Sequence, residues 1–363
     1  MSPPFRDLAQ HLKRAAQRAQ AAARRQAGRP AEPQLSLWTA IKVATVAEIA
    51  ILGAAAAFLA LAGWFSAWLD LFAQWTALWF LLSAIAAVAA WLAVERGRLR
   101  AQILLIASAG VVFSVTLMAP DFGRAALDAL GGRAKAAPVL KILTFNVWDD
   151  NVNPQKTADL MLATDADLIA LQEVWGLSKP QFNRIWAIYP YRTQLKPGCE
   201  AVIFSKRPLT ASDTDVVMVG DHPTCFVWAR SSAADGRPVT LMTTHYAWPV
   251  PPGAQATQRE ILAARVRAFD LNELIVTGDF NLTPWSQAMR SQDAALAPLQ
   301  RRTHALFSWP ANIAVLGVPA PFPLLAIDHI YAGAAWRTVK VQRLARGGSD
   351  HYGVLASLAH DAR

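Results

Sequence analysis

Three long apolar stretches occupy the first third of this 363-residue chain. They cover about residues 41–64, 71–94 and 101–119, and short polar breaks separate them. A helix of about 20 apolar residues spans a hydrocarbon core, and each stretch approaches or exceeds this length. We therefore predict three transmembrane helices within residues 41–119. Buried core helices or a cleavable signal peptide fit less well, because three such runs follow one another and the first begins about 40 residues into the chain.

The positive charges around these stretches predict their orientation, because Lys and Arg accumulate on the cytoplasmic side of a membrane. The first break contains Asp70 and neither Lys nor Arg. The N-terminal segment 1–40 and the second break carry many of them: Arg6, Lys13, Arg14, Arg18, Arg24, Arg25, Arg29, Arg96, Arg98 and Arg100. We expect a multi-pass protein of the cell (inner) membrane, with a cytoplasmic N-terminus and an extracytoplasmic, periplasmic C-terminal part. Residues 5–27 form either a basic helix on anionic lipid or a solvated tail.

The rest of the chain divides into a linker, 120–138, and one large domain, 139–363. The first 141 residues hold 15 of the 35 Lys and Arg but only 7 of the 26 Asp and Glu, so the C-terminal domain is nearly neutral. Non-specific binding of nucleic acid relies on Lys and Arg that neutralise phosphates. The charge balance argues mildly against long DNA as a dedicated ligand, although a local basic groove stays open.

Short apolar or alternating segments in the C-terminal domain predict more strands than helices. We expect helices at 154–163, 178–188 and 253–269, a Pro-rich loop at 308–323, and strands at about 139–145, 168–171, 200–205, 214–219, 224–231, 238–244, 274–277, 326–332, 336–343 and 352–358. Hairpin-like and crossover connections both occur, which indicates mixed α/β architecture. Cys199 and Cys225 each open a predicted strand, and the sequence leaves a disulfide and two free thiols as alternatives.

Polar side chains lie where several predicted strands end. Asp279 and Asn281 follow the apolar run 274–277 and stand two residues apart, so their side chains point the same way along an extended chain. The other polar residues at such positions are Asn146, Gln172, Glu173 and His245, and two C-terminal motifs add Asp328, His329, Ser349, Asp350 and His351.

The order of these motifs resembles the endonuclease/exonuclease/phosphatase superfamily, which includes pancreatic deoxyribonuclease, abasic-site endonucleases, inositol-polyphosphate 5-phosphatases and neutral sphingomyelinases. The resemblance covers about residues 139–358. It implies an α/β four-layer sandwich, in which two mixed β-sheets face each other with helices outside, here preceded by three transmembrane helices. One position departs from the pattern, because Trp148 stands where the family often has an Asp two residues after the Asn.

The resemblance also implies phosphoester hydrolysis with a divalent cation, Mg²⁺ or Mn²⁺. Carboxylate oxygens suit these ions, and we expect Glu173 and Asp350 to hold the metal. Asn146 is expected to bind the metal shell or the phosphate. Asp149 lies close enough in sequence to reach the site, but we assign it no role.

The remaining motif residues have expected roles around the phosphate. Asp279 is the expected base that orients the attacking water, and Asn281 holds the water or a phosphoryl oxygen. His245 and His351 place imidazoles, which exchange protons near neutral pH, at the phosphoryl group or the leaving oxygen. Asp328 would orient His351. We expect His329 and Ser349 to be structural.

The motifs do not distinguish one phosphoester from another. Our leading hypothesis is a membrane-anchored phosphodiesterase or phosphatase that acts outside the cytoplasm, with the lipid bilayer as its surroundings and no evident protein partner. The alternative is a metal-dependent endonuclease or exonuclease that acts on DNA or RNA, and a third possibility is a non-catalytic scaffold. Four aromatic residues either form an apolar wall beside the site, which would suit a lipid, or pack in the core: Tyr246, Trp248, Trp285 and Trp309.

Overall fold

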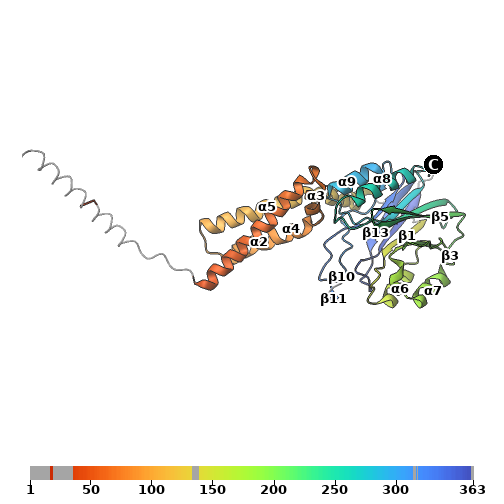
Figure 1. Ribbon diagram of the computed structural model, residues 1–363, viewed down its shortest axis with the longest axis horizontal. Helices are drawn as coiled ribbons and strands as arrows, with labels where there is room; N and C mark the ends of the chain where they lie inside the picture. Colours follow the sequence, from red (N-terminus) through yellow and green to blue (C-terminus); the bar gives the residue numbers. More distant parts are fainter. Residues whose placement is uncertain (1–16, 19–35, 133–138, 314–315, 317, 361–363) are drawn as a thin grey trace, which may run out of the picture. The chain divides into compact units, whose positions relative to one another are not determined.

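The computed structural model describes residues 17–18, 36–132, 139–313, 316 and 318–360 (Figure 1). The chain forms two compact units, Met1–Val46 and Ala47–Arg363. In the first unit the described residues include the beginning of helix α2 (Leu37–Leu61). Most of the basic segment predicted at 5–27 lies outside the described residues.

Among the described residues, three helices are long and apolar enough to cross a membrane, which agrees with the predicted number of spans. They are α2 with the short turn that follows it, α4 (Thr76–Ala93) and α5 (Arg98–Leu127). The second span begins later than expected, because a separate helix α3 (Ala67–Gln74) precedes it and Ser66 caps that helix. The third continues through Pro120, so the first part of the predicted linker is helical.

Small residues allow these helices to approach closely. A Cβ atom on Gly53 of α2 or on Gly110 of α5 would clash with the Ser83 hydroxyl of α4. The same Cβ on Gly110 would lie 2.9 Å from Ala54 Cα of α2. Membrane helices associate through such close packing, because lipid tails are as apolar as their side chains.

The described part of the C-terminal domain contains two six-stranded mixed sheets. The first has the order β13-β14-β1-β2-β4-β3, and only its β1–β2 pair is parallel. Its strands are β1 (Leu140–Asn146), β2 (Leu168–Gln172), β3 (Tyr191–Arg192), β4 (Val202–Ser205), β13 (Trp336–Arg343) and β14 (Val354–His360).

The second sheet has the order β5-β6-β7-β8-β12-β9, and only its β7–β8 pair is parallel. Its strands are β5 (Ala211–Val219), β6 (His222–Ser232), β7 (Pro238–His245), β8 (Leu274–Asp279), β9 (Gln300–Arg301) and β12 (Asp328–Ala332). The two-residue strands β10 (Asn312–Ile313) and β11 (Val318–Pro319) pair within the predicted Pro-rich loop.

Alternating strand residues from both sheets form one buried core, including Ile142 and Leu358 of the first sheet and Leu241 and Ile275 of the second. Helices α6 (Pro154–Ala163) and α7 (Lys179–Ile188) pack on the outer face of the first sheet. Helices α8 (Ala254–Val266) and α9 (Gln287–Ala295) lie on the opposite side of the strands (Figure 1). The predicted four-layer sandwich is therefore confirmed.

A disulfide joins Cys199, which precedes β4, to Cys225 of β6, with the two Cα atoms 5.4 Å apart. It decides between the two alternatives that the sequence left open. Because β4 and β6 belong to different sheets, the bond ties the sheets together.

Helix α3 is bonded to the C-terminal domain through two buried polar side chains. Gln74 Oε1 accepts hydrogen bonds from the backbone nitrogen of Thr283 at 2.8 Å and from its hydroxyl at 3.0 Å. The Asp70 carboxylate accepts from the first amides of α9, Gln287 N at 2.7 Å and Ala288 N at 2.9 Å. A carboxylate at a helix N-terminus is favourable, because free N–H groups and the helix dipole meet it there. These bonds fix the segment that immediately follows Asn281.

Candidate active site

The predicted site residues meet where the parallel strands of the two sheets end. Asn146 pairs with Gln172 at the end of β1 and β2, and His245 pairs with Asp279 at the end of β7 and β8. Asp328 begins the antiparallel strand β12 directly opposite Asp279. The register of the strands therefore brings together side chains that lie far apart in the sequence.

Asn146 connects the two sheets at this edge. Its amide nitrogen donates to Glu173 Oε1 at 2.7 Å and to Asp279 Oδ2 at 3.1 Å, and its oxygen accepts from Trp148 N. Glu173 follows β2 with a positive φ of 49°, a left-handed conformation that is uncommon for residues other than glycine. Strained backbone of this kind persists where surrounding contacts determine it, often at functional sites. Here it directs the carboxylate toward Asn146.

Asp279 is almost fully buried and faces two imidazoles. Its Oδ2 atom lies 3.5 Å from Nε2 of His245 and 3.5 Å from Nε2 of His351. Burial raises the pKa of Asp279 to about 6, although the positive charges of the two histidines oppose this increase. The carboxyl group can therefore be ionised at neutral pH and still accept a proton readily.

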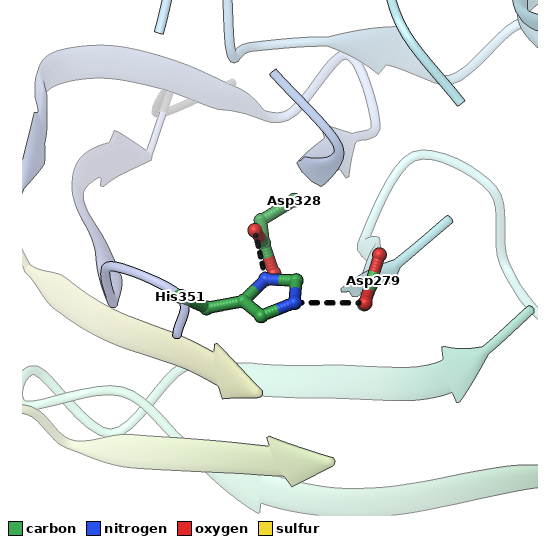
Figure 2. A group of neighbouring side chains, drawn as sticks. All are labelled: Asp279, Asp328 and His351. Atoms are coloured by element: carbon green, nitrogen blue, oxygen red, sulfur yellow. Dashed lines mark hydrogen bonds and ion pairs between the residues drawn. The ribbon is translucent and has the colours of Figure 1, made fainter. Parts of the chain in front are cut away.

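Figure 2 shows the His351 ring between two carboxylates. Its Nδ1 atom is 2.9 Å from Asp328 Oδ2, and its Nε2 atom faces Asp279. Burial alone would lower the pKa of His351, but the charges of Asp328, Asp279 and Asp350 outweigh it and hold this pKa well above its ordinary value. The geometry agrees with an orienting position for Asp328.

Glu200 completes the site, and it was missing from the sequence-based set. Its Oε1 atom lies 2.6 Å from Nδ1 of His245. Burial opposes a charge on this imidazole, yet the bond to Glu200 and the charge of Asp279 raise the pKa of His245 to about 9. The same bond lowers the pKa of Glu200. The sequence signal was its position alone, an acid at the first residue of the strand predicted at 200–205.

Asn281 is held by the loop after β7. Its backbone has a positive φ of 50°. Its side-chain nitrogen Nδ2 donates to the Tyr246 carbonyl at 2.9 Å and lies 3.4 Å from His245 Nε2. Asp279 Oδ1 accepts from Asn281 N at 2.9 Å, which closes an Asx turn after β8. Gln255 anchors this turn further by donating to the Asn281 carbonyl.

The acids at this edge form a donor set suited to a hard divalent cation. Asp350 Oδ1 is buried without a hydrogen-bond partner among the described residues, while Oδ2 accepts from Trp309 Nε1 at 2.9 Å. Burial raises the pKa of Asp350, and the neighbouring charge of Glu173 raises it further. Burial and the charges of Glu173 and Glu200 likewise raise the pKa of Asp149 to about 6. A divalent cation beside Glu173 and Asp350 would relieve this repulsion through oxygen ligands of the kind that Mg²⁺ prefers.

A second group of possible ligands, Asp279, Asp328 and His351, has donor atoms within 4.8 Å of one another. The hydrogen bonding in this group fits a proton relay better than a metal site. An imidazole whose pKa is held high by three carboxylates carries protons on both nitrogens and offers no lone pair to a metal. We therefore place the candidate cation beside Glu173 and Asp350.

Other predicted residues have structural surroundings. Both ring nitrogens of His329 have partners outside the site, the Leu282 carbonyl and the Thr303 hydroxyl. Ser349 donates to the Asn146 carbonyl at 2.8 Å and shapes the turn before His351. Tyr246 and Trp285 are buried in the core, so the apolar wall considered for four aromatic residues is reduced to Trp248 and Trp309.

A cavity of about 660 Å³ opens beside His245 and Glu200. Trp175 and Trp248 also line it. Among the described residues, Lys196 is the one lysine or arginine in its lining, and its ammonium group is paired with Asp213. The cationic groups of the cavity lining are therefore the paired Lys196 and His245, which is bonded to Glu200, and the described lining contains no run of lysines and arginines that would form a basic groove.

The sequence profile of the Endonuclease/Exonuclease/phosphatase family matches residues 143–351, more than half of the chain. These residues contain every strand-end side chain described above. The chain belongs to this family. Members of this family are hydrolases that act on phosphoesters. No curated protein matches the sequence.

Several solved structures are similar to this chain at low sequence identity. Sphingomyelinase C from Streptomyces griseocarneus is 18% identical and has a TM-score of 0.49, over 61% of this chain and 99% of its own. TDP2 from D. rerio, complexed with a single-strand DNA product, is 18% identical with a TM-score of 0.48, over 61% and 98%. A beta toxin variant from Staphylococcus aureus with bound magnesium ions is 17% identical with a TM-score of 0.45, over 60% and 99%.

Proposed function

We propose that this protein is a membrane-anchored, divalent-metal-dependent phosphoester hydrolase that acts on the extracytoplasmic side of the cell membrane. The observation that carries the proposal is the buried Asp279 carboxylate, which faces the imidazoles of His245 and His351. Beside it, one oxygen each of Asp328 and Asp350 is buried without a hydrogen-bond partner among the described residues. Phosphoester hydrolysis needs an aimed water, donors for the phosphoryl oxygens and a protonated leaving group. The residues at this edge offer all three.

Asp279 is the proposed general base. A water that attacks phosphorus transfers a proton to its carboxylate, which the pKa of about 6 leaves ionised at neutral pH. His245, with a pKa of about 9, is protonated and gives its Nε2 proton to the leaving oxygen as the phosphorus–oxygen bond breaks. His351, fixed by Asp328, donates to a phosphoryl oxygen, and the Asn281 amide assists in holding the water.

Glu173 and Asp350, with Asn146 nearby, would hold Mg²⁺ or Mn²⁺. When bound, such an ion polarises the phosphoryl group and offsets its developing charge. The local excess of carboxylates supports this part of the proposal, because those charges need a counter-ion.

The extracytoplasmic location rests on three features. The positive residues Arg96, Arg98 and Arg100 flank the break between the second and third apolar helices. Three spans would then put the C-terminal domain across the membrane from them. The Cys199–Cys225 disulfide fits an oxidising compartment.

Plasmid DNA and phospholipid vesicles, offered side by side to the full chain with Mg²⁺, test the function. We expect release of a phosphorylated headgroup or of phosphate, lost in Asp279→Asn and His351→Gln and kept in the control Asp159→Asn, whose exposed carboxylate pairs with Arg184 outside the site. DNA nicking that is lost in the same two variants would establish the nuclease alternative instead. Mg²⁺ binding without turnover of either substrate would favour the scaffold.

A further inference from the structure

A second cavity, of about 440 Å³, lies between the membrane-side helices and the loop after β7. Trp68, Phe72, Trp75 and Trp79 line it from α3, α4 and their junction, and Trp248 and Val250 line it from the loop. Gln74 is the polar residue in its wall, and its side-chain oxygen is already bonded to Thr283. The interior of this cavity therefore offers hydrocarbon contacts and almost no hydrogen bonds.

The apolar cavity adjoins the catalytic cavity, because Trp248 and Val250 line both. On the far side of this shared wall are His245, the proposed acid for the leaving group, and Glu200. A ligand that crosses the wall can therefore place a polar end at the histidine and an apolar end among the tryptophans.

Trp309 connects the same cavity to the proposed metal site. Its ring lies 6.1 Å from Trp75 and 5.7 Å from Trp248, measured between ring centroids, and its Nε1 atom donates to Asp350 at 2.9 Å. The aromatic side chains thus form a continuous surface from the membrane-side helices to an acid of the active site.

The cavity lies beside a helix that is a candidate membrane span. Trp79 belongs to the candidate span Thr76–Ala93, and α3 immediately precedes that span. The side of the cavity away from the core is open: Trp68 is 61% exposed, Trp248 51% and Val250 61%. Large apolar surfaces left open in this way mark sites of contact with a partner or a membrane.

We infer that the phosphoester substrate carries a long alkyl or acyl chain, and that this apolar cavity holds the chain while the phosphoester reaches His245. The inference rests on the proposed function and adds the substrate class to it. A polynucleotide has no apolar chain to fill the tryptophan-lined cavity. For its phosphates, the catalytic cavity offers one lysine, which is already paired with Asp213. A membrane lipid matches both cavities, because it joins an apolar chain to a phosphate ester.

A series of alkyl 4-nitrophenyl phosphodiesters tests the inference on the full chain in phosphatidylcholine nanodiscs. The methyl, hexyl and dodecyl esters share one leaving group, and in each case water bonds to phosphorus as the bond to 4-nitrophenolate breaks. We expect kcat/KM to rise with chain length. In Trp68→Ala the dodecyl-to-methyl ratio of kcat/KM should fall about ten-fold, the effect of removing the burial of about two methylene groups.

Long chains also partition into the nanodisc, which raises their local concentration without any contribution from the cavity. The variant Trp91→Ala controls for this effect. Trp91 is an equally exposed tryptophan of α4, but it lies against Arg100 away from the cavity. We expect Trp91→Ala to keep the wild-type dodecyl-to-methyl ratio of kcat/KM. A wild-type ratio in Trp68→Ala as well would overturn the inference.

A dodecyl phosphate with a terminal diazirine gives a readout that does not need turnover. Photolabelling at residues 66–75 and 246–250 should be displaced by dodecyl phosphate, not by methyl phosphate, and should weaken in Trp248→Ala. Saturable labelling without hydrolysis of any ester would keep the cavity and refute the proposed function. Hydrolysis with no saturable labelling and no chain-length dependence in any variant would keep the function and refute the cavity.

Discussion

His245 depends on a residue outside the familiar motifs. Glu200 bonds its Nδ1 atom at 2.6 Å, while Nε2 faces Asp279. The bond to Glu200 keeps the ring protonated and fixes its Nε2–H toward Asp279. This arrangement makes Glu200 a positioning residue for His245.

We expect Glu200→Gln to lower kcat by about ten-fold or more, within the range by which groups that orient a histidine affect activity. The amide keeps an acceptor for Nδ1 but loses the negative charge that raises the pKa of His245. The matched control is Glu273→Gln, since Glu273 pairs with His360 through a similar carboxylate–imidazole contact outside the site. Equal activities in the two variants would remove Glu200 from the site.

His329 has the opposite electrostatic surroundings. Burial, assisted by the charge of Arg301, lowers the pKa of this imidazole to about 4, so the folded protein holds it neutral. The unfolded chain binds the proton near the ordinary value of 6.5. The free energy of unfolding is therefore unaffected by protonation of His329 above about pH 6.5. It decreases as the pH falls from 6.5 toward 4, because the unfolded chain then binds a proton that the folded protein does not.

Thermal unfolding of the full chain in detergent, followed between pH 7 and pH 4, measures this dependence. We expect His329→Gln to be less stable than the wild type at pH 7 and to lose less stability on acidification. The difference should reach at most about 3 kcal/mol, because one pKa unit corresponds to about 1.4 kcal/mol. Parallel pH profiles for both proteins would contradict the assignment of a neutral buried histidine.

At the scale of elements, α3 has a larger role than its short length implies. It separates two candidate spans and provides Asp70 and Gln74, which bond α9 and the turn after Asn281. The membrane-side helices thereby hold one wall of the active site. The third span contributes as well, because Asp121 of α5 is paired with Arg301 of β9.

Removing the Asp70 carboxylate should loosen this attachment. In Asp70→Ala, two backbone amides of α9 lose their buried acceptor, and each unsatisfied buried group costs about 1–3 kcal/mol. We expect a lower melting temperature by differential scanning fluorimetry. Asp159→Ala is the control, since its ion pair with Arg184 is exposed and contributes at most about 1 kcal/mol. Equal melting temperatures for the two variants would argue against the attachment.

The sequence predicted the helices and strands with strong patterns and missed the weakly patterned ones. Helix α6 spans 154–163 as predicted, because the Asn153 cap and the first-turn Pro154 act locally. Helix α9 was missed because its sequence is mostly polar, and its first turn is supported by the local Ser286 cap and by a tertiary bond to Asp70. Helix α3 was merged with the second span, since hydropathy alone does not register the Ser66 cap.

The same distinction applies to the residues of the site. Polar motif residues at the ends of predicted strands could be recognised in the sequence, and the strand register brings them together, as with His245 and Asp279. Glu200 was missed because its role depends on β4 running antiparallel to β2, and pairing between strands is not written in either strand alone.

For the whole molecule, we predict that the break before the third span is cytoplasmic and that the domain after this span is extracytoplasmic. In Asp221→Cys the new thiol lies in the exposed turn between β5 and β6, and in Glu95→Cys it lies between α4 and α5. The native cysteines form a disulfide and should not react. We expect a membrane-impermeant maleimide to label Asp221→Cys in intact cells and Glu95→Cys only after permeabilisation. The reverse pattern would place the hydrolase in the cytoplasm.

The most direct test of the proposed hydrolase is a metal titration of its turnover. The rate of 4-nitrophenolate release from the methyl phosphodiester is measured for the full chain after EDTA treatment and stepwise return of Mg²⁺. We expect activity to vanish with EDTA and to return with Mg²⁺, and Glu173→Gln to need at least about ten-fold more Mg²⁺ than the wild type or Glu273→Gln. Turnover that survives EDTA, or a Glu173→Gln titration identical to that of the wild type, would contradict a metal-dependent phosphoester hydrolase at this site.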